Sequence, residues 1–135
     1  MKVLETSPRG ILARLLHNRM NRIQFSQLVD DALGRLPRTF KNKLENIAII
    51  VEDQPEKELQ GEFAGLLLGL FRGIPKTRQS VSWSGLPAQI FLYQKNIEAI
   101  CRTESEVTKQ IEKTLKHEIG HYFGLSEHDL RRRGY

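Results

Sequence analysis

Two histidines and a glutamate stand close together near the end of this 135-residue chain, in the sequence His117-Glu118-Ile119-Gly120-His121. Four residues are slightly more than one helical turn, so on a helix both imidazoles project from the same face and can bind one metal ion. Glu118 follows the first histidine directly, and from there its carboxylate can reach a water bound to that metal. The pattern indicates a catalytic zinc site with Glu118 as the general base.

A catalytic zinc ion needs a third protein ligand and an open fourth position. Gly124 follows the second histidine by three residues and suits the left-handed conformation that ends a helix and lets the chain fold back. Two residues after this turn carry side chains that bind zinc, Glu127 and His128. Either of them can supply the third ligand.

A stable helix must position these side chains. Thr103 can cap its start, and Glu106 three residues later completes the capping-box pattern. Apolar residues at helical spacing then form one stripe: Val107, Ile111, Leu115, Ile119, Tyr122 and Phe123. The sequence therefore predicts a long helix, ended by Gly124, that carries the site in its second half.

The upstream segments predict a small sheet with helices packed on it. Apolar residues recur at three- and four-residue spacing from Phe25 to Leu36, which indicates an amphipathic helix that Pro37 ends. Short apolar runs indicate strands at Ile47–Val51, at Leu66–Ile74 with a bend at its glycines, and at Gln89–Tyr93. The predicted fold class is α+β, with a small mixed β-sheet packed against helices.

The connections are less regular. Residues 52–62 are polar and predict a surface connection with one helical turn, and Pro75–Pro87 predicts a long loop that carries Trp83. Trp83 either lines a substrate pocket or pins its loop. Asn96 is expected to cap a short helix.

Composition and charge set limits on the function. The net charge of +5 is concentrated at the two ends of the chain, where arginines dominate. No aromatic residues are interleaved with these arginines, so binding of nucleic acid is not favoured. One cysteine and the absence of a long apolar run suit a reducing cytoplasm and exclude a membrane span. We expect a basic amphipathic extension over residues 1–24 and one domain over residues 25–135.

The stretch from His117 to Glu127 resembles the metzincin pattern of two histidines, a glycine turn and a third ligand at the eleventh position. The chain as a whole is similar to a bacterial family of small zincin-like metallopeptidases, predicted zinc-dependent proteases with a matrix-metalloprotease-like domain. The likeness extends from about Phe25 to Leu130. It includes Leu36-Pro37, Ile47–Glu52, Leu68-Gly69-Leu70-Phe71, Ser84-Gly85-Leu86-Pro87, Ile90-Phe91-Leu92-Tyr93 and the helix with both histidines.

This resemblance implies a zincin-like fold with its active-site helix near the C-terminus, Zn²⁺ held by His117, His121 and Glu127, and a peptide or protein as substrate. Register favours Glu127 over His128, although the family usually has aspartate there. Metzincins also place a methionine turn after the third ligand, and this chain has methionine only at Met1 and Met20. The support under the zinc must therefore be built differently.

Other functions stay open beside zinc-dependent peptide hydrolysis. The domain could be a catalytically weak or inactive zinc-binding module for a protein partner, which a closed site with both Glu127 and His128 bound would favour. It could be a regulatory protease for one repressor, or a nucleic-acid-associated protein that uses its basic ends. For a peptidase, we expect the strand near Ile90–Tyr93 to pair with an extended peptide.

Overall fold

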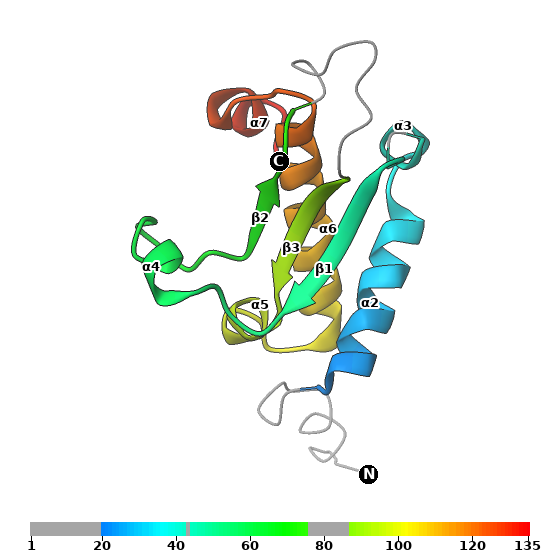
Figure 1. Ribbon diagram of the computed structural model, residues 1–135. Coiled ribbons are helices and arrows are strands. Elements are labelled where there is room, and N and C mark those ends of the chain that lie inside the picture. Colours follow the sequence, from blue (N-terminus) through cyan, green and yellow to red (C-terminus); the bar gives the residue numbers. More distant parts are fainter. Residues whose placement is uncertain (1–19, 43, 76–86) are drawn as a thin grey trace.

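The computed structural model describes residues 20–42, 44–75 and 87–135. Within them the fold is α+β, as predicted, with a three-stranded sheet and long helices on one of its faces (Figure 1). The strands are β1 (Ile47–Glu52), β2 (Gly69–Arg72) and β3 (Ala88–Tyr93). Their order is β1-β3-β2, with β1 parallel and β2 antiparallel to β3. β2 is therefore an edge strand.

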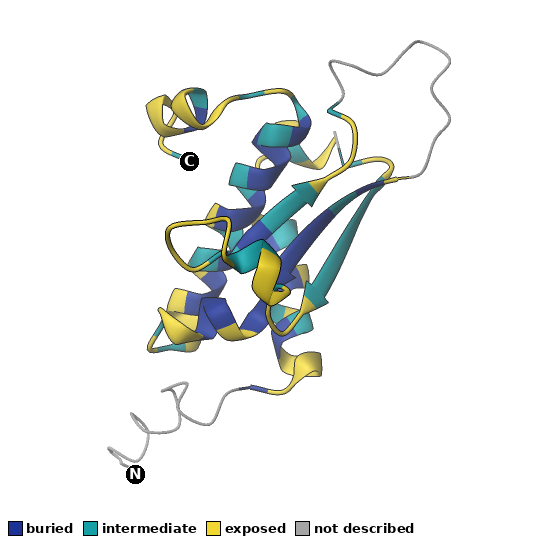
Figure 2. Ribbon diagram, turned by 60° about the vertical axis from the view of Figure 1, so that its left-hand side comes forward, coloured by how far each residue is buried: buried dark blue, intermediate teal, exposed yellow. Residues whose placement is uncertain are grey.

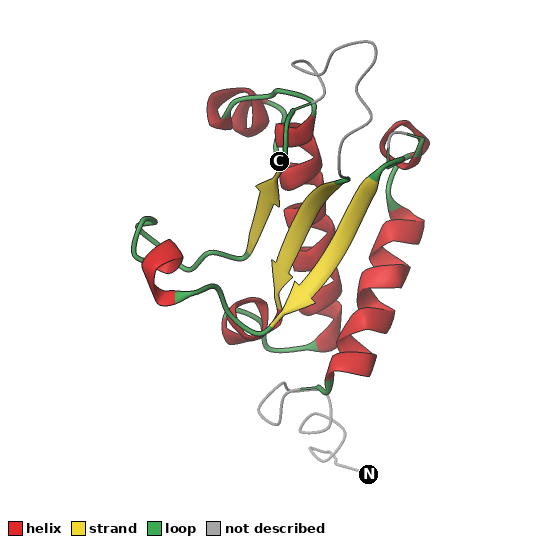
Figure 3. Ribbon diagram, in the orientation of Figure 1, coloured by secondary structure: helices red, strands yellow, loops and turns green. Residues whose placement is uncertain are grey.

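Two long helices pack on the sheet and on each other (Figure 3). They are α2 (Arg22–Arg35) and α6 (Glu104–Tyr122). The shorter helices are α3 (Arg38–Lys41), α4 (Lys57–Gln60), α5 (Gln94–Ala99) and α7 (Glu127–Arg132). The single turn of α4 confirms the helical turn predicted within residues 52–62. None of the described helices is both long and apolar enough to cross a membrane.

Helix α2 begins at Arg22, earlier than the apolar pattern predicts. Asn21 caps it with a complete capping box, in which the side chains of Asn21 and Gln24 each accept a hydrogen bond from the other's backbone N–H. Phe25 on its inner face is fully buried, and Met20 before the helix is also buried in the core. Met20 is thus part of the core and Arg22 hydrogen-bonds to Gln94 and the Val51 carbonyl, and the rest of the predicted extension before residue 20 lies outside the described residues.

Helix α6 confirms most of the prediction for the site-bearing helix. Thr103 caps it by accepting a hydrogen bond from the Glu106 N–H at 3.1 Å. The Glu106 carboxylate accepts from the Arg102 N–H at 2.6 Å, so the return half of the predicted capping box is wrong. Within the predicted stripe, Phe123 is half-buried and the other residues are buried: Val107, Ile111, Leu115, Ile119 and Tyr122.

The central strand β3 carries the core of the sheet. Ile90 and Leu92 are fully buried in the core, and Figure 2 shows buried residues running along β3 and α6. Because β3 pairs with a strand on each side, its backbone groups are already bonded. The expectation that Ile90–Tyr93 pairs with a substrate peptide is therefore wrong, since only an edge strand can do so.

Two local predictions need correction. Asn96 is not a helix cap: α5 begins at Gln94, and the buried Asn96 side chain donates a hydrogen bond to the Leu67 carbonyl at 2.8 Å. The strand predicted over Leu66–Ile74 is shorter, because only Gly69–Arg72 pairs with β3. The predicted loop with Trp83 lies almost wholly outside the described residues.

Cys101 is partly buried and packs against the core. Burial, and secondarily the charge of Glu106, raises the pKa of its thiol to about 11. The thiolate is the reactive form of cysteine, so Cys101 is unsuited to nucleophilic chemistry.

Candidate metal centre

Three predicted site residues meet at the C-terminal end of α6. The Nε2 atoms of His117 and His121 lie 3.1 Å and 2.9 Å from one oxygen, Oε1 of Glu127. The two imidazole rings are nearly perpendicular, with centroids 4.9 Å apart. The one-turn spacing on α6 thus brings both rings to one point, and the chain returns to that point with a carboxylate.

The hydrogen bonds of His121 make this point a place for a cation. Its Nδ1 lies 3.0 Å from the Leu125 carbonyl oxygen, which only accepts hydrogen bonds, so Nδ1 must carry a proton. In the neutral imidazole, Nε2 then presents a lone pair to Glu127 Oε1, which also has only lone pairs to offer. The pair is satisfied when a proton or a metal ion lies between the two atoms. A backbone carbonyl that orients a metal-binding histidine in this way is common in metal sites.

The donor set fits a zinc ion. Two imidazole nitrogens and one carboxylate oxygen are ligands of catalytic zinc, and with metal–ligand bonds of about 2.0–2.1 Å tetrahedral ligands lie roughly 3.3 Å apart. The separations of 2.9 Å and 3.1 Å are only slightly shorter. Glu127 remains 57% exposed, so the point where the three side chains meet is open to solvent on one side. That opening suits a fourth, exchangeable position.

Helix α7 delivers Glu127 through a tight reversal of the chain. Gly124 has φ 83°, the predicted left-handed conformation that ends α6. Ser126 then caps α7 with a capping box to Asp129, which fixes the first turn of that helix. Glu127 is the first residue of this turn, so the cap fixes the backbone position from which its side chain extends.

A glycine inside α6 lets α7 pack closely. A Cβ at Gly120 would lie 2.3 Å from Cδ2 of Leu130, the fully buried residue of α7. The glycine within the histidine motif is thus a contact surface for the helix that brings the third ligand. This role of Gly120 was not predicted from the sequence, although a glycine within a helix costs about 1 kcal/mol relative to alanine and indicates a packing reason.

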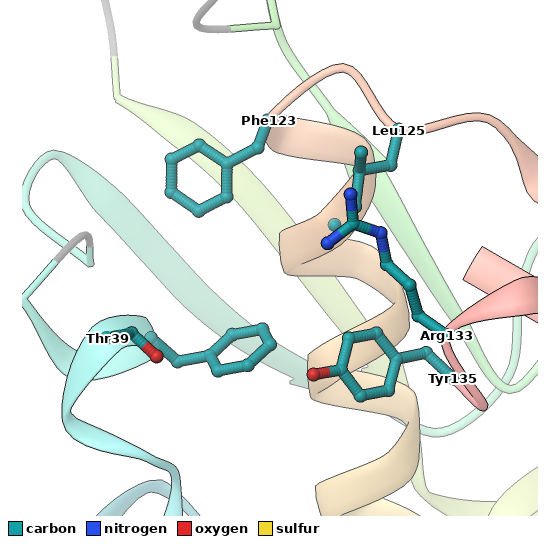
Figure 4. Close-up of a pocket in the computed structure, with 7 residues that line it drawn as sticks. Thr39, Phe123, Leu125, Arg133 and Tyr135 are labelled. Atoms are coloured by element: carbon teal, nitrogen blue, oxygen red, sulfur yellow. The ribbon is translucent and has the colours of Figure 1, made fainter. Parts of the chain in front are cut away.

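The last residue of the chain packs against α3. Tyr135 packs edge-on against Phe40 with ring centroids 5.6 Å apart. A cavity of about 290 Å³ lies there, and Figure 4 shows Arg133 and Tyr135 facing Thr39 and Phe123 around it. The chain that follows α7 is therefore packed against α3.

Glu118 occupies a different environment beside the histidines. It is 8% exposed, and its Oε1 accepts a hydrogen bond from the Phe71 N–H of β2 at 2.8 Å. Glu118, His117 and His121 offer ligand atoms that all lie within 4.8 Å of one another. Burial raises the pKa of Glu118 above its usual range, although the nearby histidines and the Phe71 N–H lower it.

The edge strand approaches α6 closely because Gly69 has no side chain. A Cβ there would lie 2.6 Å from Cγ2 of Thr114 and 2.9 Å from the Phe91 carbonyl oxygen. The Tyr93 N–H donates to the Leu68 carbonyl, so the alternation of an antiparallel ladder turns the backbone groups of Gly69 and Phe71 outward. One of these outward groups is the Phe71 N–H that holds Glu118.

Glu127 has the opposite electrostatic setting to Glu118. Its partial burial alone would raise its pKa, but its contacts with the His117 and His121 side chains lower the pKa below the ordinary value. His128, the alternative third ligand, is exposed on α7, and in the part of the chain described here it is Glu127 that contacts the imidazole pair. Tyr122 is buried against Phe71 and Phe123, which is the packing role expected of it.

Comparison with known proteins agrees with this geometry. A family model described as zincin-like metallopeptidase matches residues 44–135. This chain therefore belongs to the zincin-like metallopeptidase family, which confirms the resemblance seen in its sequence.

A solved structure has a similar fold. It is a conserved hypothetical protein from Thermus thermophilus, with a TM-score of 0.51 and 22% identity over 77% of this chain and 94% of that chain. An identity this low supports the fold alone. A comparison with curated proteins finds no match.

Proposed function

We propose that this protein is a zinc-dependent peptidase in which His117, His121 and Glu127 hold the ion and Glu118 is the general base. The observation that carries the proposal is the contact of Glu127 Oε1 with the Nε2 atoms of both histidines. In His121 the ring proton is held on Nδ1 by the Leu125 carbonyl, which leaves a lone pair on Nε2. A cation satisfies this arrangement, and a buried carboxyl group lies beside it.

When bound, zinc supplies Lewis acidity that polarises a carbonyl and makes water a nucleophile near neutral pH. Glu118 takes a proton from the attacking water and passes it to the amine that leaves. Its raised pKa suits a group that must both accept and return a proton. The Phe71 N–H fixes Oε1 and leaves the second carboxylate oxygen for the reaction. The Leu125 carbonyl keeps His121 in the tautomer that offers Nε2.

The substrate backbone has a place along β2. The outward N–H and C=O of Gly69 lie on the edge of the sheet that faces α6, next to Glu118. An extended peptide can add to such an edge through main-chain hydrogen bonds. Backbone N-methylation of a substrate at the positions that pair with Gly69 should weaken cleavage, and unchanged cleavage would exclude this binding mode.

One preparation tests the proposal. Bound zinc, measured by elemental analysis, should fall in His117→Ala and His121→Ala and persist in Glu118→Gln, with the exposed His128→Ala as the matched control. Cleavage of a peptide pool, read by mass spectrometry, should fall about 10²–10⁴-fold in Glu118→Gln. Full zinc in both histidine variants would exclude the metal site, and undiminished cleavage by Glu118→Gln would exclude the role of Glu118.

A further inference from the structure

A groove of about 430 Å³ leads away from the metal centre between the edge of β2 and α6. It begins at His117 and Glu118 and runs one to two helical turns toward the start of α6. The residues used below line it: Leu67, Leu68, Ile100, Lys113, His117 and Glu118. A substrate held at the metal centre would therefore extend into this groove.

One wall of the groove is apolar. Leu67 and Leu68, just before β2, are half-buried. Ile100, after α5, is 51% exposed, and the neighbouring Leu66 is exposed to the same extent. When another apolar side chain covers exposed apolar side chains next to a site of this kind, the burial lowers the free energy and favours binding.

The facing wall carries one cation, Lys113. It is exposed and makes no ion pair within the described part of the chain. Nearby polar side chains of α6 already have partners, since Glu112 forms an ion pair with Arg35 and Gln110 donates a hydrogen bond to Thr114. Lys113 precedes His117 by four residues, so it lies one turn from the metal centre on the same side of α6.

We propose that this groove selects peptides that carry an apolar residue near an acidic one, and that Lys113 is the specificity-determining residue for the acid. The inference rests on the proposed function, because the groove matters only for a peptide held at the same site. The apolar residue covers Ile100 and the two leucines, and the Asp or Glu side chain pairs with the Lys113 ammonium. An exposed pair of this kind gives a preference of about two- to fivefold for acid over amide.

The test reads binding and cleavage separately. Immobilised, zinc-loaded Glu118→Gln protein is incubated with a random peptide pool, and the retained peptides are sequenced by mass spectrometry. The same experiment is done after adding Lys113→Glu, or Lys109→Glu as the control. Lys109 is an exposed lysine of the same helix outside the groove, so the control makes the same change in net charge. Circular dichroism checks that the variants are folded.

We expect Asp and Glu to be enriched about two- to fivefold at one position near an apolar residue. Lys113→Glu should shift this preference to Lys and Arg, and Lys109→Glu should leave it unchanged. The proposal is overturned if no peptide is retained, if no acid is enriched, or if both lysine variants change the profile equally. Cleavage by the unmodified protein is measured in parallel. Retention of acidic peptides without cleavage would contradict the peptidase function and support the proposed selectivity of the groove. Cleavage without acid selection would support the peptidase function and contradict the selectivity.

Discussion

The two carboxylates beside the histidine pair are held in opposite ways. Glu118 is buried, bonded to the edge of β2, and has a raised pKa, whereas Glu127 is exposed, carried by α7, and has a lowered pKa. A glycine makes each approach possible: Gly69 lets β2 reach Glu118, and Gly120 lets α7 pack down with Glu127. In the proposed mechanism, proton transfer and metal binding therefore depend on two different flanks of the site, which mutation can separate.

Gly69→Ala is expected to give the largest effect, and to separate the Glu118 flank from the zinc-binding flank. The new Cβ meets Thr114 at 2.6 Å and the Phe91 backbone at 2.9 Å, so β2 must move away from α6. We expect a loss of about 1–3 kcal/mol of unfolding free energy and a large fall in peptidase activity, with zinc content retained. Gly65→Ala is the control, because nothing lies within 4 Å of its Cβ. Loss of zinc together with activity would show that the two flanks are not separable.

Gly120→Ala should affect the other flank. Its Cβ would lie 2.3 Å from the Leu130 side chain, so α7 is displaced and zinc affinity falls. The cost in stability should be smaller than for Gly69→Ala, since the clash is with the end of a side chain and alanine gains about 1 kcal/mol of helix propensity. Adding Leu130→Ala should restore zinc binding. Gly34→Ala in α2 is the control, and isothermal titration with zinc gives the measurement.

Substitutions at two matched helix caps test the comparison of the two flanks with a smaller perturbation. Ser126→Ala and Thr103→Ala each remove a capping oxygen and should each cost about 0.5–2 kcal/mol of stability. Only Ser126 caps the helix that carries Glu127. We therefore expect weaker zinc binding in Ser126→Ala alone, measured by competition with a chelator. Equal zinc affinities would mean that α7 does not need its cap to position the ligand.

The smallest effect is a pair of opposite pH slopes in metal-free protein. The pKa of Glu118 is raised by burial, so its contribution to stability is present at low pH and lost as pH rises through the raised folded value. Partial burial also acts to raise the pKa of Glu127, but its contacts with the two histidine side chains outweigh this effect and the net shift of the pKa is downward. The contribution of Glu127 is therefore present above the unfolded pKa and lost as pH falls through the folded value.

Urea denaturation across the acid range in the presence of a chelator measures these slopes. Glu118→Gln should remove the decline of stability toward higher pH, and Glu127→Gln should remove the loss in acid. The same slope in both variants would show that the two carboxyl groups share one environment.

Local signals in the sequence predicted much of this arrangement. The stripe on α6, its Thr103 cap and the turn at Gly124 depend on residues close in sequence, so spacing reveals them. The order of strands depends on which segments meet in space, and the sequence therefore did not reveal that β3 is central and β2 an edge. The same holds for Gly69, the Phe71 N–H and the Leu125 carbonyl: the first is a close approach between distant segments, and the others are backbone groups with no residue signature.

The proposed metal centre depends most on its third ligand, which is assigned to Glu127 and not to its neighbour His128. The most direct measurement is the equilibrium zinc affinity of Glu127→Ala and His128→Ala beside the unmodified protein, by chelator competition. Loss of a hydrogen-bond partner of a ligand typically costs about 10–100-fold in metal affinity. Loss of a ligand itself should cost at least as much, so we predict such a fall for Glu127→Ala and no change for His128→Ala. Unchanged affinity in Glu127→Ala with a fall in His128→Ala would contradict the site described here.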